Sequence, residues 1–279
     1  MEPRKRGNGF LRAKIRHAVL TTAADRLTLG ALARRHHRQE IEVRSIELAC
    51  PLWPAAHDGM RIAHVTDFHL GALMPIGRAV DAVERLARHA PDLVACTGDV
   101  VDLESDGAGP LMAALGAVPA PKGRFLVLGN HDHLDDPGAL CDLAATHGIE
   151  VMHGMVRAVD PDAAPLLVGG VDWGRTVRDN DRMVRALPCV PHLLLAHNPK
   201  AFHAASRAGV ALTLSGHTHG GQVAVKGRPR ANISFAHRLS AGTYRQNRCT
   251  LHVSVGAGAW FPLRVHCAPE VLLITVRRG

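Results

Sequence analysis

Groups of metal-binding side chains each follow a short apolar run of this sequence. Imidazole, carboxylate and amide oxygen form a mixed ligand set that suits Mn²⁺, Fe²⁺, Zn²⁺ and similar divalent ions. A carboxylate can bridge two ions, and two ions can hold both the attacking and the leaving oxygen of a phosphate displacement. These residue types therefore favour metal-assisted hydrolysis of a phosphate ester. The groups are Asp67-Phe68-His69, Gly98-Asp99, Gly129-Asn130-His131-Asp132, His197-Asn198 and Gly216-His217-Thr218-His219.

Glycines stand next to several of these ligands. Because glycine has no Cβ atom, the backbone can approach metal ions and a bound phosphate without a steric clash. Two divalent cations with two aspartates leave a net charge of about +2, which favours a hydroxide nucleophile and an anionic phosphate. The glycines concerned are Gly98, Gly129, Gly216, Gly220 and Gly221.

The runs that precede these ligand groups predict β-strands, because they are short, apolar and rich in β-branched residues. An apolar stripe predicts a helix over 76–89, and Asn198-Pro199 predicts the start of a helix over 200–207. In α/β sheets, sites form beyond the carboxyl ends of the strands, so five such ends could converge on one cleft. The order of elements predicts an α/β layered protein with more than one sheet. The predicted strands are 61–66, 92–97, 124–128, 166–171, 192–196, 210–215, 222–225, 250–255 and 271–276.

The order and spacing of these motifs resemble the calcineurin-like metallophosphoesterase superfamily. Asp-x-His, Gly-Asp-x-x-Asp, Gly-Asn-His-Asp and Gly-His-x-His follow one another over residues 67–219. Further similarity at 196–199, 216–222, 262–264 and 269–270 is typical of a bacterial phosphodiesterase-like subgroup, of which some members hydrolyse UDP-diacylglucosamine. The resemblance implies a four-layer αββα sandwich of two mixed β-sheets. It leaves a basic amphipathic leader over 1–40 outside the catalytic domain, which we expect over 41–279.

The resemblance also implies a role for each matching residue. Asp99 would bridge two divalent ions, for which we expect Mn²⁺, with Fe²⁺ or Zn²⁺ as alternatives. His131 would protonate the leaving oxygen or stabilise its charge, and Asp132 would orient His131. We expect Asp102 to be a structural member of its motif. The implied ligands are Asp67, His69, Asp99 and His219 for one ion, and Asp99, Asn130, His197 and His217 for the other.

The expected activity is hydrolysis of a phosphodiester or pyrophosphate bond by attack of metal-bound hydroxide, with a lipid-linked substrate such as UDP-diacylglucosamine as the first candidate. A nuclease or a cyclic-nucleotide phosphodiesterase is the alternative, and a metal-free scaffold is the alternative of another class. We do not expect nucleic acid as the partner, because aromatic residues for base stacking make up only 4% of the chain.

The net charge of +8 is concentrated at the start of the chain. Residues 1–38 hold ten Lys or Arg residues against two acidic ones, so the remaining chain is formally neutral. Such a leader fits a helix on an anionic membrane surface, and it also fits a helix packed on the protein's own body. Six scattered cysteines indicate reduced thiols, so we expect a cytoplasmic protein, peripheral on the inner membrane if the leader binds lipid. The leader's apolar residues at helical spacing are Phe10, Leu11, Ile15 and Val19.

Overall fold

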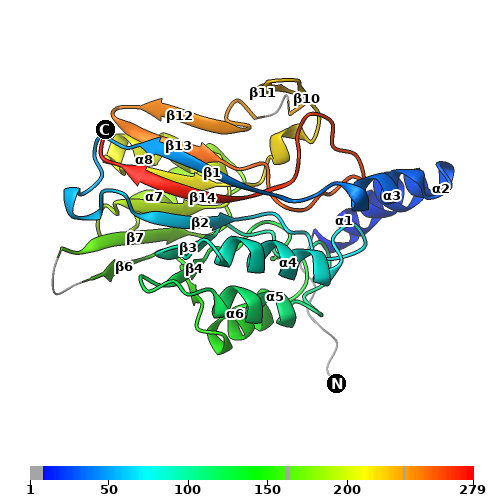
Figure 1. The fold of residues 1–279 in the computed structure, drawn as a ribbon, viewed down its shortest axis with the longest axis horizontal. Helices are drawn as coiled ribbons and strands as arrows, with labels where there is room; N and C mark the ends of the chain where they lie inside the picture. Colours follow the sequence, from blue (N-terminus) through cyan, green and yellow to red (C-terminus); the bar gives the residue numbers. More distant parts are fainter. Residues whose placement is uncertain (1–8, 161–163, 235–236) are drawn as a thin grey trace.

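Two six-stranded mixed sheets form the centre of the computed structural model, which describes residues 9–160, 164–234 and 237–279. Figure 1 shows the sheets at the middle of the molecule, with helices on their outer faces and the first three helices at the end opposite the C-terminus. Three of the leader's basic residues, Arg4, Lys5 and Arg6, lie outside the described residues.

The first sheet has the strand order β1-β14-β2-β3-β4-β5. Strands β2 to β5 run parallel, and β14 is parallel to β1 but antiparallel to β2. The strand nearest the end of the chain therefore lies inside the sheet, between the two strands nearest its start. The bounds are β1 (Glu42–Ala49), β14 (Glu270–Arg277), β2 (Arg61–Val65), β3 (Leu93–Cys96), β4 (Arg124–Leu126) and β5 (Glu150–Val151).

The second sheet has the order β12-β13-β9-β8-β7-β6. Its four central strands run parallel, and the edge strands β12 and β6 are antiparallel to their neighbours. A small hairpin, β10 (Ala224–Val225) with β11 (Arg228–Asn232), lies beside it. The bounds are β12 (Gly242–Gln246), β13 (Cys249–Val253), β9 (Leu212–Ser215), β8 (Leu193–Ala196), β7 (Leu166–Val171) and β6 (Met155–Val159).

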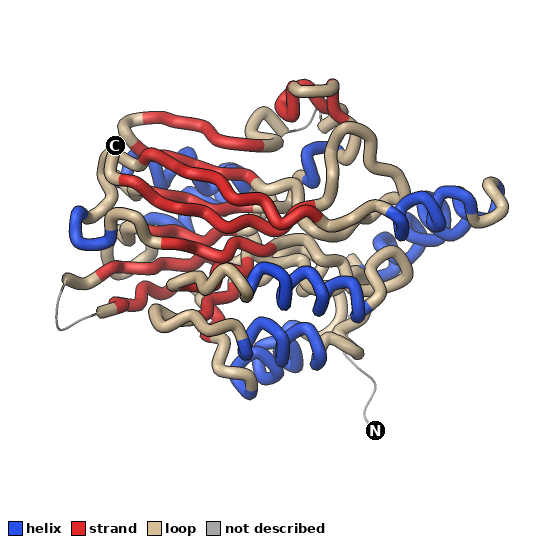
Figure 2. The backbone as a smooth tube through the Cα atoms, in the orientation of Figure 1, coloured by secondary structure: helices blue, strands red, loops and turns tan. Residues whose placement is uncertain are grey.

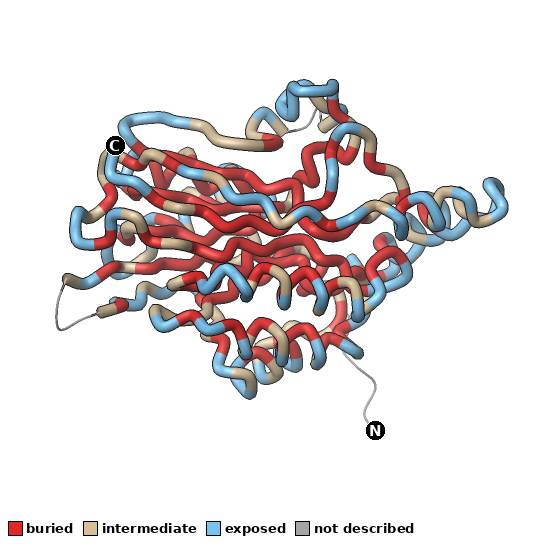
Figure 3. The backbone as a smooth tube through the Cα atoms, viewed as in Figure 1, coloured by how far each residue is buried: buried red, intermediate tan, exposed pale blue. Residues whose placement is uncertain are grey.

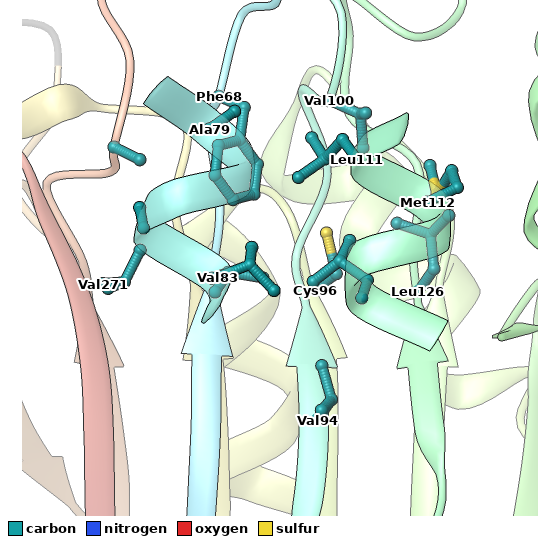
Figure 4. Packing of buried hydrophobic residues seen from close by; sticks show 14 of the residues in the cluster. Phe68, Ala79, Val83, Val94, Cys96, Val100, Leu111, Met112, Leu126 and Val271 are labelled. Carbon is teal, nitrogen blue, oxygen red and sulfur yellow. The ribbon is translucent and has the colours of Figure 1, made fainter. Parts of the chain in front are cut away.

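Helices cover the outer face of each sheet, so that the layers follow one another as helix, sheet, sheet and helix (Figures 1 and 2). Helices α4 (Ile76–Ala87), α5 (Gly109–Ala117) and α6 (Pro137–Thr146) pack on the first sheet, and α7 (Val177–Arg185) and α8 (Phe202–Ala208) on the second. Figure 4 shows Val83 of α4 and Leu111 of α5 above the strands. This arrangement confirms the αββα sandwich expected from the sequence.

The inner faces of the two sheets share one apolar core. Ile62 and Leu93 of the first sheet belong to the same buried cluster as Leu195 and Leu214 of the second. Burying an aliphatic side chain of this size contributes about 1.5–3 kcal/mol. Figure 3 shows the central strands of the sheets buried along most of their length, so the core holds the ends of these strands in fixed positions.

The leader forms α1 (Phe10–His17), a π-helix η1 (Ala18–Ala23), α2 (Ala24–Leu27) and α3 (Ala31–Arg38). One side packs on the body, because Phe10, Ala13 and His36 are buried. The leader also leaves large apolar residues exposed, namely Leu11, Ile15, Val19, Leu27 and Leu29. Among the described residues, every helix is too short or too polar to span a bilayer. The boundary at residue 40 stays a prediction.

Candidate metal centre

Strand ends from both sheets meet and place metal-binding side chains together. The loop after β2 carries Asp67 and His69, and the loop after β9 carries His219. The Nε2 atoms of His69 and His219 lie 2.9 Å apart, and Asp67 Oδ1 lies 3.2 Å from His219 Nε2. These three buried residues, the first cluster, offer ligand atoms within 4.8 Å of one another.

A second cluster, Asp99, His197 and His217, lies beside the first and also offers ligand atoms within 4.8 Å of one another. Asp99 Oδ2 lies 3.2 Å from His197 Nε2 within this cluster. The same oxygen lies 3.4 Å from His69 Nε2 of the first cluster. One carboxylate therefore touches both clusters, which is the geometry that a bridging ligand requires.

The hydrogen bonds around the clusters leave lone pairs that suit cations. His69 Nδ1 lies 3.3 Å from Asp102 Oδ1, and His197 Nδ1 lies 2.7 Å from the carbonyl oxygen of Thr97. A proton on each Nδ1 would serve these acceptors and leave Nε2 as a lone pair, the usual arrangement behind a metal-bound histidine. The buried Oδ1 atom of Asn130 accepts no hydrogen bond among the described residues. Because buried polar atoms are rarely left unsatisfied, these nitrogen and oxygen lone pairs fit a pair of divalent ions.

The pKa values of the cluster residues also fit metal binding. Burial alone would raise the pKa of Asp99, but His197 and His131 hold it well below its usual range. Burial lowers the pKa of His219 to about 4 and the pKa of His217 well below its ordinary value. Burial opposes a charge on His197, yet Asp99 raises the pKa of His197 to about 9. The carboxylate of Asp99 is therefore ionised and the imidazoles of His217 and His219 are neutral, as metal ligands would be, whereas His197 would have to release a proton to bind a cation.

His131 lies at the rim of the clusters with a defined tautomer. Its Nδ1 donates to the carbonyl oxygen of Asp102, and its Nε2 lies 2.9 Å from a guanidinium nitrogen of Arg16. Because arginine can only donate, Nε2 of His131 accepts and the proton is on Nδ1. Burial lowers the pKa of His131, but the charges of Asp99 and Asp102 outweigh burial and raise it.

Two aspartates have contacts that differ from those expected from the sequence. Asp102 contacts His69 and His131 with Oδ1, at 3.3 Å and 3.2 Å, and so stands behind both imidazoles. Asp132, expected to orient His131, instead accepts from the backbone N–H groups of Val100, Val101 and Gly129. Asp132 thus fixes the loops that carry the ligands, while Asp102 contacts the imidazole.

The ligand loops adopt a backbone conformation that side chains rarely take. Asp67, His69, Asp99, His217 and His219 all have φ between 48° and 72°. For residues other than glycine, this left-handed conformation costs free energy, and strained backbone of this kind is common at functional sites. The surrounding loops must therefore hold each ligand in place.

Two glycines permit this crowding. A Cβ atom on Gly216 would lie 2.0 Å from Asp67 Oδ2, and one on Gly129 would lie 2.2 Å from Asp99 Oδ1. Three glycines that the sequence singled out have other neighbours: Gly98 faces the backbone of Gly129, and Gly220 and Gly221 face the side chain of Val255 and the backbone of Ser234. The close approach of backbone to site residues, which was expected of these glycines from the sequence, is therefore found directly at Gly216 and Gly129.

Arg264 is a site residue that single-residue reasoning from the sequence missed. It is buried, and its guanidinium donates to the carbonyl oxygens of Val255 and Gly258. One nitrogen also lies 3.3 Å from His219 Nδ1. Arg264 therefore ties the loop after β13 to a ligand of the first cluster. Its only signal was its place in the Pro-Leu-Arg motif that carried part of the resemblance.

A cavity of about 720 Å³ opens beside the second cluster. Asn130, His131 and His217 line it, and Trp173 lies against His217 with ring centroids 4.7 Å apart. Arg12, Ala13 and Arg16 of α1 also line it. A substrate in this cavity would lie against Asn130, His131 and His217.

Comparisons with known proteins agree with this geometry. A family model described as calcineurin-like phosphoesterase matches residues 60–221, which contain both clusters. An uncharacterized metallophosphoesterase of Aquifex aeolicus is 30% identical over 233 residues, 78% of this chain and 85% of that protein. The uncharacterized metallophosphoesterase YkuE of Bacillus subtilis is 27% identical over 276 residues, 91% and 93% of the two chains. Phosphodiesterase YaeI of Escherichia coli is 28% identical over 229 residues, 77% and 81%.

Proposed function

This chain belongs to the calcineurin-like phosphoesterase family, and from that membership we propose that it is a dinuclear hydrolase of phosphodiester or pyrophosphate bonds. The observation that carries the proposal is the contact of Asp99 with both clusters, at 3.2 Å and 3.4 Å. The name of the Escherichia coli relative, a phosphodiesterase, supports the same class of substrate. Mn²⁺ is our first choice of metal, with Fe²⁺ or Zn²⁺ as alternatives.

Each site residue has a task that follows from its position. Asp67, His69 and His219 would hold one ion, and Asn130, His197 and His217 the other, with Asp99 between them. Bound there, the two ions would supply an activated water and would stabilise negative charge on the phosphate. His131 would lie on the departing side of the substrate, and Asp102, 3.2 Å from its Nδ1, would hold the ring in orientation.

The proposal is tested by metal analysis and a substrate screen. Protein loaded with Mn²⁺ should contain two ions per chain and should hydrolyse bis(p-nitrophenyl) phosphate faster than a phosphomonoester. The screen also includes UDP-diacylglucosamine, a cyclic nucleotide and single-stranded DNA, which represent the alternatives. Folded protein that binds no metal after loading would contradict the dinuclear proposal and favour the scaffold. Two bound ions without hydrolysis of any diester or pyrophosphate would contradict the activity.

We propose in addition that the leader attaches to an anionic membrane surface, which would hold the enzyme near a lipid-linked substrate. The supporting observation is the exposed stripe of Leu11, Ile15 and Val19, spaced four residues apart on helical backbone, with the exposed basic residues Arg12 and Lys14 beside it. Each basic residue near an anionic leaflet contributes about 1 kcal/mol, and salt weakens the attraction. We therefore propose a peripheral protein at the cytoplasmic face of the membrane.

Vesicle sedimentation tests the attachment. The protein should sediment with phosphatidylglycerol vesicles at low salt and be released at high salt. Replacing all three stripe residues by serine should weaken sedimentation at least about tenfold, since each loses a buried apolar contact. Val177→Ser, a change at an exposed apolar residue of α7, is the control and should leave sedimentation unchanged. Equal sedimentation of the triple variant and the intact protein would refute the attachment.

A further inference from the structure

The leader forms one wall of the cavity beside the metal clusters. Arg12 and Arg16, one turn apart on α1, line it together with Arg175 and Lys200 from the body. The described residues that line the cavity include no aspartate or glutamate. Basic groups from two separate parts of the chain therefore face one space of about 720 Å³. Such a lining favours an anion with more than the single charge of a simple phosphodiester.

Two consecutive residues of α1 contact the interior of the site. Arg16 lies 2.9 Å from His131 Nε2, and His17 Nδ1 lies 2.9 Å from Asp102 Oδ2. Asp102 in turn contacts His69 of the first cluster. Helix α1 is thus fastened beside the metal clusters, and its arginines take a set position relative to them.

We propose that Arg16 binds the leaving group of the substrate, and that this leaving group is itself a phosphate, so that the substrate is a diester of pyrophosphoric acid. The inference rests on the proposed function, in which His131 marks the departing side. Arg16 uses one donor on His131 and carries four more N–H groups, in a planar fork that matches phosphate oxygens. Arg12 stands one turn away to share the second charge.

The chemistry of the two possible leaving groups separates them. An alkoxide must receive a proton as it departs, whereas a phosphate needs its charge to be stabilised. In the structure Arg16 donates to His131 Nε2, so a guanidinium lies on the side that His131 marks. A guanidinium stabilises the charge of a departing phosphate, and it does not give up a proton to an alkoxide. This geometry serves a departing phosphate.

The reaction balances without another reactant. One water adds to the attacked phosphorus, and the bond from that phosphorus to the bridging oxygen breaks. The bridging oxygen keeps the electron pair and departs as part of a second phosphate monoester. Two singly charged phosphoryl groups become two doubly charged monoesters, and the two protons of the water pass to solution above the second pKa of about 6.

Kinetics on two substrates tests the role of Arg16. ADP-ribose is a diester of pyrophosphoric acid, and bis(p-nitrophenyl) phosphate has a leaving group that is not a phosphate. Arg16→Gln should lower kcat/KM for ADP-ribose about ten- to a hundredfold, the value of a charge-assisted hydrogen bond, and change that for the nitrophenyl diester less than about twofold. Arg16→Lys should restore part of the loss, because it keeps the charge without the fork.

Binding without turnover supplies a second readout. In metal-free protein, the dissociation constant of ADP-ribose from isothermal titration calorimetry should rise about tenfold in Arg16→Gln. Arg26→Gln, which removes an exposed arginine of α2 and the same charge from the leader, is the matched control and should behave as the intact protein. Circular dichroism checks that all variants stay folded.

Three outcomes would overturn the inference. The first is equal loss on both substrates, which would mean that Arg16 only maintains the site. The second is an Arg26 variant as impaired as the Arg16 variant, which would mean that the net charge of the leader, and not the position of Arg16, determines activity on ADP-ribose. The third is intact protein that cleaves the nitrophenyl diester but leaves ADP-ribose unchanged, which would leave the proposed function standing. Inactivity on both substrates would instead remove the proposed function, and this inference with it.

Discussion

At the scale of single residues, the site depends on buried charges that neutralise one another through shared partners. Asp99 is buried with oxygens 3.2 Å from His197 and 3.4 Å from His69, and its Oδ1 accepts from the backbone of His131. Removing its charge would leave two imidazole clusters without the anion between them. A buried group that loses its partner costs several kcal/mol, far more than an exposed one.

Asp99→Asn should therefore lose both ions and all hydrolysis while keeping the fold. An amide has one oxygen acceptor and cannot bridge two cations as a carboxylate does. Elemental analysis should find fewer than one ion per chain after loading, against two in the intact protein. Asp142→Asn, at an exposed position of α6, is the control and should keep both ions. Two retained ions in the Asp99 variant would show that another residue bridges them.

Gly216→Ala should disturb the first cluster by steric overlap alone. The added Cβ would lie 2.0 Å from Asp67 Oδ2 and 2.2 Å from Thr66 Oγ1, so the ligand loop must move. Overpacking of this kind costs about 1–3 kcal/mol, and the movement should also weaken metal binding. Gly77→Ala in α4 is the control, because its Cβ meets nothing within 4 Å. Urea unfolding should show a lower free energy of unfolding for Gly216→Ala. It should show a slightly higher one for Gly77→Ala, since alanine favours helix.

The sequence allowed the ligands to be proposed, but not their supporting contacts. Asp, His and Asn carry a recognisable chemistry in themselves, so Asp67 or His197 could be named from type and position. Arg264 and Arg16 carry no such signal, because arginine is common on surfaces. Their roles come from a buried position and from the packing of α1, which appear only in three dimensions.

At the scale of elements, the leader packs on the rest of the protein through α3 as well as α1. His36 of α3 is 1% exposed, and burial together with Arg264 and Arg78 lowers the pKa of His36 to about 3. An unfolded histidine titrates near 6.5. The folded protein therefore keeps His36 neutral where the unfolded chain takes up a proton, so folding loses stability as the pH falls below about 6.5.

His36→Leu should remove this pH dependence. One group contributes at most about 1.4 kcal/mol per pH unit, so the intact protein should lose about 1–2 kcal/mol more than the variant between pH 7 and pH 5. Urea titrations at both pH values measure the difference. His89→Leu, at an exposed position, should not alter the slope. Parallel pH profiles for the intact protein and the His36 variant would count against a neutral, buried His36.

The elements that carry the ligands were predictable, and several others were not. Strands β2, β3, β4, β8 and β9 were expected within two residues at either end, because short, continuous apolar runs are typical of buried parallel strands. Helix α5 has apolar residues on all sides, Gly109–Ala117, so no stripe marks it. Helix α7, Val177–Arg185, is mostly charged and is held by a capping box from Thr176 to Asp179, which a search for apolar stripes misses.

At the scale of the whole molecule, the two sheets hold a centre that should be more stable with its ions than without them. Ligand binding to the folded state alone adds about 2.7 kcal/mol at one hundred times the dissociation constant. One kcal/mol raises the Tm of a domain of this size by about 2 °C. Saturating Mn²⁺ should therefore raise the Tm by about 5 °C per site relative to protein in chelator, and scanning calorimetry measures this. An unchanged Tm in the intact protein would contradict binding to the folded state.

The position of β14 governs when this protein can be assembled during its synthesis. β14 lies between β1 and β2, but it is made after every other described strand. At about 5–20 residues per second, the ribosome needs roughly ten seconds or more to pass from residue 65 to residue 277. During that time β1 lacks its parallel neighbour, and one side of β2 is an open strand edge able to pair with other chains. A nascent chain stopped before residue 270 thus carries complete ligand motifs and no finished first sheet, so protection of that edge by a chaperone matters most in those seconds.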